Sequence, residues 1–264
     1  MRVLILGAGV VGKATGLGLA RFGHQVTFAD NNQTALDPVQ AKGYPCRLCR
    51  QGGVVPSAEV VFVCTPEDQV AAVVKSLKDV PGDLVIRSST FPGSTEQLAI
   101  GLGRTIFHNP EFLREQTAED DFLHSRMAIL GRAAPGRAED RVHGVMVETL
   151  YRHMGLKLVW TSATVSETVK LVLNNYLATL ISYWNEVHLL CDTLGVNSHE
   201  VARIATLDSR VARYGAYRHG EPYGGRCLPK DLDRMIGFYT ERGARADLLQ
   251  AVRAVNELIC KEAK

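Results

Sequence analysis

The chain has 264 residues, of which 46% are hydrophobic and 22% are charged. This length and composition are typical of a globular protein of one or two domains with its own core, and they exclude the disordered and fibrous classes. Thirty basic and 28 acidic residues leave a formal net charge of +2. Without a dense run of Lys or Arg, we expect no nucleic-acid partner.

No uncharged apolar run reaches the roughly 18 residues of a membrane-spanning helix. The N-terminal segment MRVLILGAGVVG has too short an apolar stretch and too many glycines for a secretory signal. We therefore expect a cytoplasmic protein with no membrane partner. Its cysteines are too sparse for a disulfide framework and predict free thiols. Cys46 and Cys49 form a lone CxxC pair without the further ligands of a zinc site, so we predict no metal.

The first half of the chain alternates short β-rich runs with helical patterns. Strands are expected at 2–6, 25–30, 58–66, 83–90, 105–110, 126–131 and 156–161, and helices at 10–22 and 139–153. Such alternation predicts an α/β fold, a Rossmann-like doubly wound and mostly parallel sheet. Apolar runs such as VVFV suit a sheet that is covered on both faces. We place this domain at residues 1–162.

The second part of the chain is predicted to be a smaller all-helical domain, residues 163–264. Residues 166–194 have a 3.6-residue apolar period and contain neither Pro nor Gly, which predicts one long helix. We expect Thr164 or Ser166 to cap it, Glu167 to place a favourable charge in its first turn, and Gly195 to end it. Further helical patterns lie at 198–206, 232–242 and 246–264.

A glycine-rich segment, GAGVVG at 7–12, directly follows a predicted strand and opens a helix, and Asp30 ends the next strand. Gly7 permits the tight turn, Gly9 lets the backbone approach a pyrophosphate, and Gly12 allows close packing of the helix on the strand. Asp30 would accept a hydrogen bond from a ribose 2′-OH and repel a 2′-phosphate, which favours NAD over NADP. The predicted NAD-binding residues are Gly7, Gly9, Val11, Gly12 and Asp30. There are two alternatives: the segment binds FAD, or its glycines serve only the packing of the turn and bind no ligand.

Cys227 lies in the segment YGGRCLPKD, between Arg226 and Lys230 and just before a predicted helix. Cationic neighbours and a helix N-terminus favour the thiolate, so we predict a nucleophile. The alternative, a buried and inert thiol, fits Cys64, Cys191 and Cys260.

Lys170 and Asn174 stand four residues apart on the predicted long helix, with Glu167 on the same side. A buried lysine can serve as a base or stabilise an alkoxide. The alternative is that Lys170 and Asn174 lie on a solvent-exposed face of the helix, which is the more common situation for such a pair. Glu111 follows a strand end, where open α/β sheets bind ligands. It could orient a water molecule or cap a helix.

A series of motifs along nearly the whole chain resembles the UDP-glucose/GDP-mannose dehydrogenase family. In chain order they are GAGVVG, Asp30, CTP at 64–66, SSTFPGST at 88–95, NPEFLRE at 109–115, ETVKLVLNNYLATLISYWNE at 167–186 and GGRCLPKD at 224–231. The resemblance implies an NAD-dependent enzyme that oxidises the primary alcohol of a nucleotide-linked sugar to a carboxylate through a cysteine thioester.

The same resemblance assigns residue roles. Cys227 would be the nucleophile, Lys170 and Asn174 would stabilise the oxyanion, Asp231 would assist the base, and Glu111 would manage the hydrolytic water. Further cofactor-side positions are implied at Thr65, Thr90 and Lys230. A homodimer through the helical domain is also implied.

The sequence departs from the family pattern at two places. Family members continue into a C-terminal domain that binds the substrate's nucleotide, whereas this sequence ends at Lys264 in what resembles the central helix. Gln116 stands where the family has Gly, at the sugar-binding turn. We therefore expect a smaller nucleotide- or nucleoside-linked sugar as substrate, or a site completed by a partner protein or by a dimer interface.

Two other functions compete with this one. A two-electron β-hydroxyacid dehydrogenase has a similar two-domain size and a Lys-xxx-Asn pair but needs no cysteine. Cys227 therefore distinguishes the nucleotide-sugar dehydrogenase from this alternative. A truncated NAD-binding pseudoenzyme or interaction module has no chemical need for the polar set Cys227, Lys170, Asn174, Asp231 and Glu111.

Overall fold

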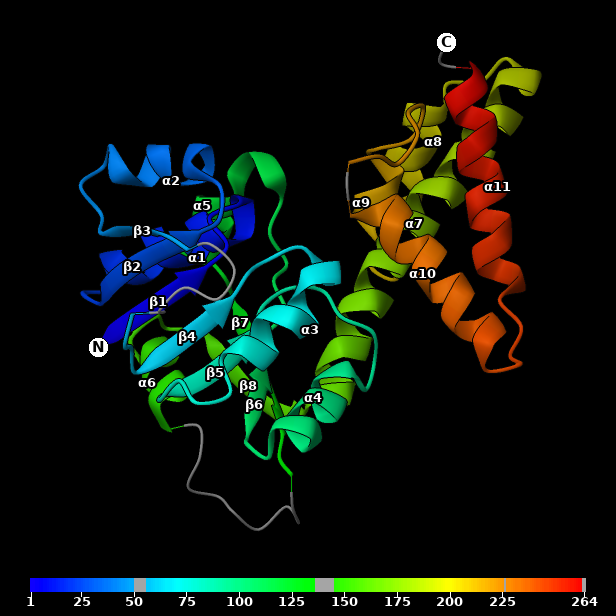
Figure 1. Cartoon of the computed structure of the whole chain (residues 1–264). Helices are drawn as coiled ribbons and strands as arrows, with labels where there is room; N and C mark the ends of the chain where they lie inside the picture. Colours follow the sequence, from blue (N-terminus) through cyan, green and yellow to red (C-terminus); the bar gives the residue numbers. More distant parts are fainter. Residues whose placement is uncertain (50–55, 136–144, 226, 263–264) are drawn as a thin grey trace. The chain divides into compact units, whose positions relative to one another are not determined.

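The computed structural model describes residues 1–49, 56–135, 145–225 and 227–262. The chain divides into two compact units, residues 1–170 and residues 171–264. The division falls inside the long helix α7 (Ala163–Leu194), which Figure 1 shows passing from one unit into the other. The sequence-based boundary, after residue 162, lies at the start of this helix.

The first unit is built on one eight-stranded sheet with the order β3-β2-β1-β4-β5-β6-β7-β8. Its strands are β1 (Arg2–Leu6), β2 (Gln25–Asp30), β3 (Cys46–Leu48), β4 (Val60–Val63), β5 (Asp83–Ile86), β6 (Ile106–His108), β7 (Met127–Ala133) and β8 (Lys157–Ser162). Over the described residues neighbouring strands run parallel, except that β6 and β7 are antiparallel. The predicted mostly parallel sheet is confirmed. The edge strand β3 was not predicted, because three residues are too few to show a period.

Helices cover both faces of this sheet. They are α1 (Val10–Arg21), α2 (Gln33–Gln40), α3 (Glu67–Ser76), α4 (Ser94–Leu102), α5 (Ala118–Leu123) and α6 (Val145–Arg152). Alternate residues of β4 enter opposite cores: Phe62 packs with α1, α2, α5 and α6, whereas Val61 and Val63 pack with α3 and α4. The prediction from VVFV is therefore confirmed. The predicted helix at 139–153 is observed from Val145, and residues 139–144 lie outside the described part.

In its described residues the second unit contains helices joined by loops and no strand, so the predicted helical domain is observed. After α7 come α8 (Ser198–Ala205), α9 (Arg213–Ala216), α10 (Leu228–Glu241) and α11 (Asp247–Glu262). Helix α10 begins before the predicted residue 232, because Cys227 is its N-cap and Pro229 lies in the first turn, where a missing N–H breaks no helical hydrogen bond. None of the helices described here is both long and apolar enough to cross a membrane.

The start of α7 differs from the prediction. Ser162 Oγ accepts a hydrogen bond of 3.2 Å from the Val165 N–H, so Ser162 caps the helix and neither Thr164 nor Ser166 does. Glu167, expected in the first turn, lies just after that turn and is fully buried. Both differences arise because the strand before α7 leads directly into the helix, so its first turns are covered by the sheet. Gly195, with φ of +65°, follows the last helical residue, as predicted.

Candidate active site

The glycine-rich segment joins the carboxyl end of β1, an interior strand of the sheet, to α1. Gly7 has φ of +96°, and a Cβ there would lie 2.6 Å from the Cys64 carbonyl oxygen, so both conformation and space demand glycine. A Cβ on Gly12 would collide with the Gly7 carbonyl. The space beside Gly9 is open, and this N-cap residue of α1 makes no side-chain cap. The first turn of α1, which includes Val11, thus presents N–H groups that fit a pyrophosphate.

Asp30 ends β2 next to this segment. Its carboxylate accepts hydrogen bonds from the Ala8 N–H at 2.7 Å and the Asn32 N–H at 2.9 Å. It is half-buried, in the position from which such a carboxylate binds a ribose hydroxyl. Thr65 lies on the other side of Gly7, and its buried Oγ1 has no partner among the described residues. Because a buried hydroxyl is ordinarily satisfied, this orphaned atom also fits a ligand or an ordered water.

Glu167 of α7 anchors the segment that follows β5. Its carboxylate accepts hydrogen bonds from the Thr90 hydroxyl (2.9 Å), the Gly93 N–H (2.6 Å), and the N–H and hydroxyl of Thr95 (2.9 and 2.6 Å). Burial raises the pKa of Glu167, and these hydrogen bonds oppose that rise. The Thr90 hydroxyl is thus directed to Glu167. No pattern along the chain predicts this anchor, because its partners lie more than 70 residues away from Glu167.

Lys170 and Glu111 form a buried ion pair in the first unit. Lys170 Nζ donates to Glu111 Oε1 at 2.9 Å and to the Glu111 carbonyl oxygen at 2.7 Å. Burial acts to raise the pKa of Glu111, but the Lys170 ammonium and the Leu113 N–H outweigh it, and the pKa is lowered overall. Lys170 is 4% exposed, so it does not belong to a solvated helix face. Glu111 caps no helix here.

Asn174 and Asp231 form the corresponding pair in the second unit. Asn174 Nδ2 donates to Asp231 Oδ2 at 2.5 Å, and Asn175 Nδ2 donates to the Asp231 carbonyl oxygen at 3.3 Å. Asp231 is fully buried. Its second carboxylate oxygen lies 3.5 Å from Arg234 and 3.7 Å from Lys230, which is itself exposed. Two successive asparagines of α7 therefore hold the first turn of α10.

Cys227 is exposed and is the N-cap of α10, the helix that also carries Asp231. A helix N-terminus stabilises a thiolate, as the sequence analysis expected. The neighbouring Arg226 lies outside the described residues. Exposure together with this position distinguishes Cys227 from an inert core thiol.

The other cysteines are in part as predicted. Cys191 is buried, and burial raises the pKa of the Cys64 thiol to about 12. Cys260, expected to be buried, is exposed, because the preceding Ile259 occupies the core-facing position of α11. Within the described ranges, no three His, Cys, Asp or Glu residues are grouped so that they could hold a metal ion.

Comparison with known proteins covers both units. Residues 164–258 match the model of the UDP-glucose/GDP-mannose dehydrogenase family, central domain. Residues 2–90 match the model described as NADP oxidoreductase coenzyme F420-dependent. The UDP-glucose 6-dehydrogenase of Rhizobium meliloti is 28% identical over 302 residues, an alignment covering 97% of this chain and 68% of that protein.

Solved structures show the same similarity. A UDP-glucose dehydrogenase from Pyrobaculum islandicum superposes with a TM-score of 0.83 at 25% identity, covering 97% of this chain and 68% of that one. A 3-hydroxyisobutyrate dehydrogenase from Mycobacterium tuberculosis shares the fold, with a TM-score of 0.71 at 18% identity, covering 99% and 93%.

These matches agree with the geometry of the two units. The glycine-rich segment, Asp30 and the orphaned Thr65 hydroxyl fit a nicotinamide dinucleotide, and the central-domain match contains Lys170, Asn174, Cys227 and Asp231. The resemblance found in the sequence is thereby confirmed over nearly the whole chain. This chain is an NAD(P)-binding dehydrogenase, and its residues 164–258 match the central domain of the UDP-glucose/GDP-mannose dehydrogenase family.

Proposed function

We propose that this protein oxidises the primary alcohol of a nucleotide-linked sugar, or of a smaller nucleotide- or nucleoside-linked sugar, to a carboxylate, using NAD and a thioester on Cys227. The observation that carries the proposal is the pair of buried polar contacts made by α7, Lys170 with Glu111 and Asn174 with Asp231. The names of the relatives support the substrate class. The free cysteines fit a reducing compartment, so we place the activity in the cytoplasm.

The first oxidation removes a proton from the alcohol oxygen and a hydride from its carbon. NAD bound at residues 7–12 supplies the hydride acceptor. Asp231 assists removal of the proton, while Lys170 and Asn174 donate hydrogen bonds to the oxygen as negative charge develops. Each side chain keeps one donor hydrogen for this role. Lys170 Nζ has three hydrogens and its described contacts use two of them, whereas Asn174 Nδ2 has two hydrogens and its described contact uses one. The product is an aldehyde.

The second oxidation needs the thiolate. Cys227 Sγ adds to the aldehyde carbon to give a thiohemiacetal, and loss of a second hydride from that carbon gives a thioester. Water then attacks the thioester carbon, and cleavage of its C–S bond releases the carboxylate and restores the thiol. Glu111, held by Lys170, accepts the proton of the attacking water. One alcohol thus yields two hydrides.

The proposal is tested by the number of NADH molecules formed per substrate consumed, across a panel of UDP- and GDP-sugars, nucleosides and β-hydroxyacids. Two NADH per nucleotide-linked sugar is the expected result. One NADH from a hydroxyacid and none from the sugars would favour the β-hydroxyacid dehydrogenase, whose fold is shared over nearly the full length of both chains. No turnover on the panel would favour a binding module.

Asp30 is proposed to select NAD over NADP, because its carboxylate would repel a 2′-phosphate. Replacing Asp30 by Ala should lower the ratio of kcat/KM for NAD to that for NADP by about 10- to 100-fold, the equivalent of one charge-assisted hydrogen bond. The exposed Asp37 of α2 provides a control, since Asp37→Ala should leave the ratio unchanged. A wild-type enzyme that already prefers NADP would refute the assignment.

A homodimer through the helical unit is also proposed. One face of α7 carries large apolar side chains that are exposed, and four- or seven-residue steps separate them: Val172, Tyr176, Tyr183, Leu190 and Leu194. A row of this kind marks an interaction surface, and a second copy can cover it in a two-fold interface.

We expect wild-type protein to sediment as a dimer and the double variant Tyr176→Glu/Tyr183→Glu to sediment as a monomer. Leu207→Glu changes an even more exposed apolar residue outside α7, and this variant should stay dimeric. A monomeric wild type would exclude this interface.

A further inference from the structure

Arg87, which follows β5, is a buried guanidinium without a charged partner. It is 5% exposed. Its Nη1 donates to the side-chain oxygen of Asn109, and lies 3.4 Å from both the Asn109 carbonyl oxygen and the Tyr151 hydroxyl. Its Nε is buried with no hydrogen-bond partner in the described part of the chain. Since a buried charge is costly unless it is paired, this arrangement lacks an anion.

The nearby acidic groups do not supply that anion. Glu111 is paired with Lys170 at 2.9 Å, and Asp121 is paired with Arg114 at 2.5 Å. Burial raises the pKa of Tyr151 and raises that of Cys64 to about 12, so both stay protonated at neutral pH. Burial also lowers the pKa of His108 to about 3, which leaves its imidazole neutral. Among these groups, two buried cations, Arg87 and Lys170, therefore face one buried anion, Glu111.

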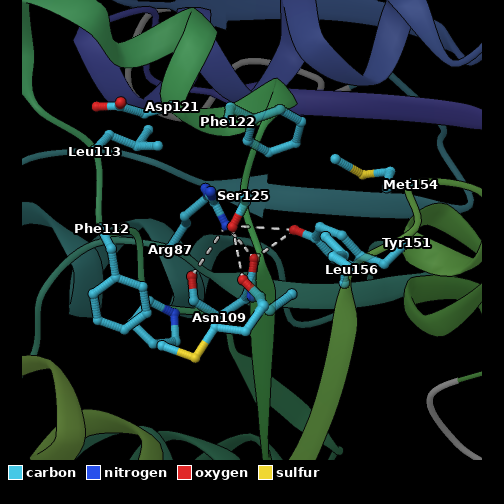
Figure 2. A pocket seen from close by; sticks show the side chains of 13 residues that line it. Arg87, Asn109, Phe112, Leu113, Asp121, Phe122, Ser125, Tyr151, Met154 and Leu156 are labelled. Carbon is cyan, nitrogen blue, oxygen red and sulfur yellow. Dashed lines mark hydrogen bonds between the residues drawn. The ribbon is translucent and has the colours of Figure 1, made fainter.

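A small cavity of about 30 Å³ lies against Arg87. Figure 2 shows Arg87 in the middle of the lining, hydrogen-bonded to Asn109 and Tyr151, with Phe122 and Leu113 on another side. A buried water requires roughly 10–15 Å³. The cavity therefore has room for one monatomic anion with a water molecule, or for water alone. Only the anion would neutralise the guanidinium.

We propose that this cavity is a binding site for a small inorganic anion, chloride, held by the Arg87 guanidinium. The anion would lie against the guanidinium and balance the excess positive charge. It would also support the segment that carries Glu111. Asn109 starts this segment: its Oδ1 accepts from Arg87 and from the Tyr151 hydroxyl, and its Nδ2 donates to the Ile129 carbonyl oxygen at 2.7 Å. The site uses neither cofactor nor substrate and does not depend on the proposed reaction.

The test is thermal unfolding of the full chain in sodium chloride and in sodium gluconate at equal ionic strength. The Tm of the wild type should rise by about 2–4 °C once chloride reaches roughly ten times its dissociation constant. Arg87→Gln should lose this difference. Arg104→Gln is the matched control, because Arg104 is a partly buried guanidinium that donates to carbonyl oxygens, including Leu77 and Gly82, away from the cavity. The Arg104→Gln variant should have a lower Tm than the wild type and should keep the difference in Tm between chloride and gluconate.

A crystal grown in sodium bromide should show an anomalous peak beside the Arg87 guanidinium. Water density alone at that position, equal Tm values in chloride and gluconate, or a chloride effect that survives in Arg87→Gln would each overturn the proposal. If Arg87→Gln does not fold, Arg87→Lys serves in its place. That variant keeps the charge but loses the planar set of donors, and it should show a smaller chloride shift than the wild type.

Discussion

Replacing Cys227 by Ser should lower the rate of carboxylate formation by roughly 10³-fold or more, the range seen when a covalent nucleophile is removed. A serine hydroxyl stays protonated at neutral pH and adds to an aldehyde far less readily than a thiolate does. The first oxidation does not need the thiol, so the variant should still bind cofactor and should stop or slow at the aldehyde level. Steady-state NADH formation and intact-protein mass spectrometry after a single turnover are the measurements.

Cys260→Ser is the matched control for this experiment, because Cys260 is also an exposed thiol but lies in α11. It should retain wild-type turnover and should still form the covalent adduct. Unchanged turnover in Cys227→Ser, together with no adduct in the wild type, would eliminate the thioester. A two-electron dehydrogenase working through Lys170 would then be the better description.

Replacing Lys170 by Met should lower the free energy of unfolding at pH 7 by about 3–5 kcal/mol, because it leaves the Glu111 carboxylate buried without its ammonium partner. Adding Glu111→Gln should recover much of this loss, because the double variant buries no unpaired charge. Lys157→Met, at an exposed position of β8, should change the free energy by no more than about 0.5 kcal/mol. Urea unfolding measures all three.

The pH dependence of the Lys170→Met effect has a definite sign. The pKa of Glu111 is lowered in the folded wild type from its usual 4.5, so the ion pair contributes stability above that pH and loses it as the pH falls through the folded pKa. In the variant, burial is no longer opposed by the ammonium, and acid protonates the unpaired carboxylate. The stability difference should therefore begin to narrow above pH 4.5, where the variant's carboxylate takes up its proton, and should narrow further as the wild-type ion pair is protonated below pH 4.5. A difference that stays constant down to pH 3, or a double variant no more stable than Lys170→Met, would contradict an ionised pair.

Local features of the sequence were enough to predict the main elements. The parallel sheet follows from short apolar runs that alternate with helical patterns along the chain, and α7 follows from an unbroken 3.6-residue period that ends at Gly195. The nucleotide turn follows from Gly7 and Gly12, where backbone conformation and close packing exclude a side chain. Each of these signals lies within one element or one turn, so the sequence states it directly.

The tertiary structure alone decided which buried polar groups meet. Glu167 was expected only to place a favourable charge at a helix start, yet its carboxylate is buried and accepts hydrogen bonds from Thr90, Gly93 and Thr95. Lys170 could not be distinguished from a surface lysine until Glu111, from the end of β6, was placed against it. Arg87 belongs to no motif, and the neutral partners of its buried guanidinium are known only from the tertiary structure. The cost of a buried charge depends on its neighbours in space, and periodicity along the chain does not specify those neighbours.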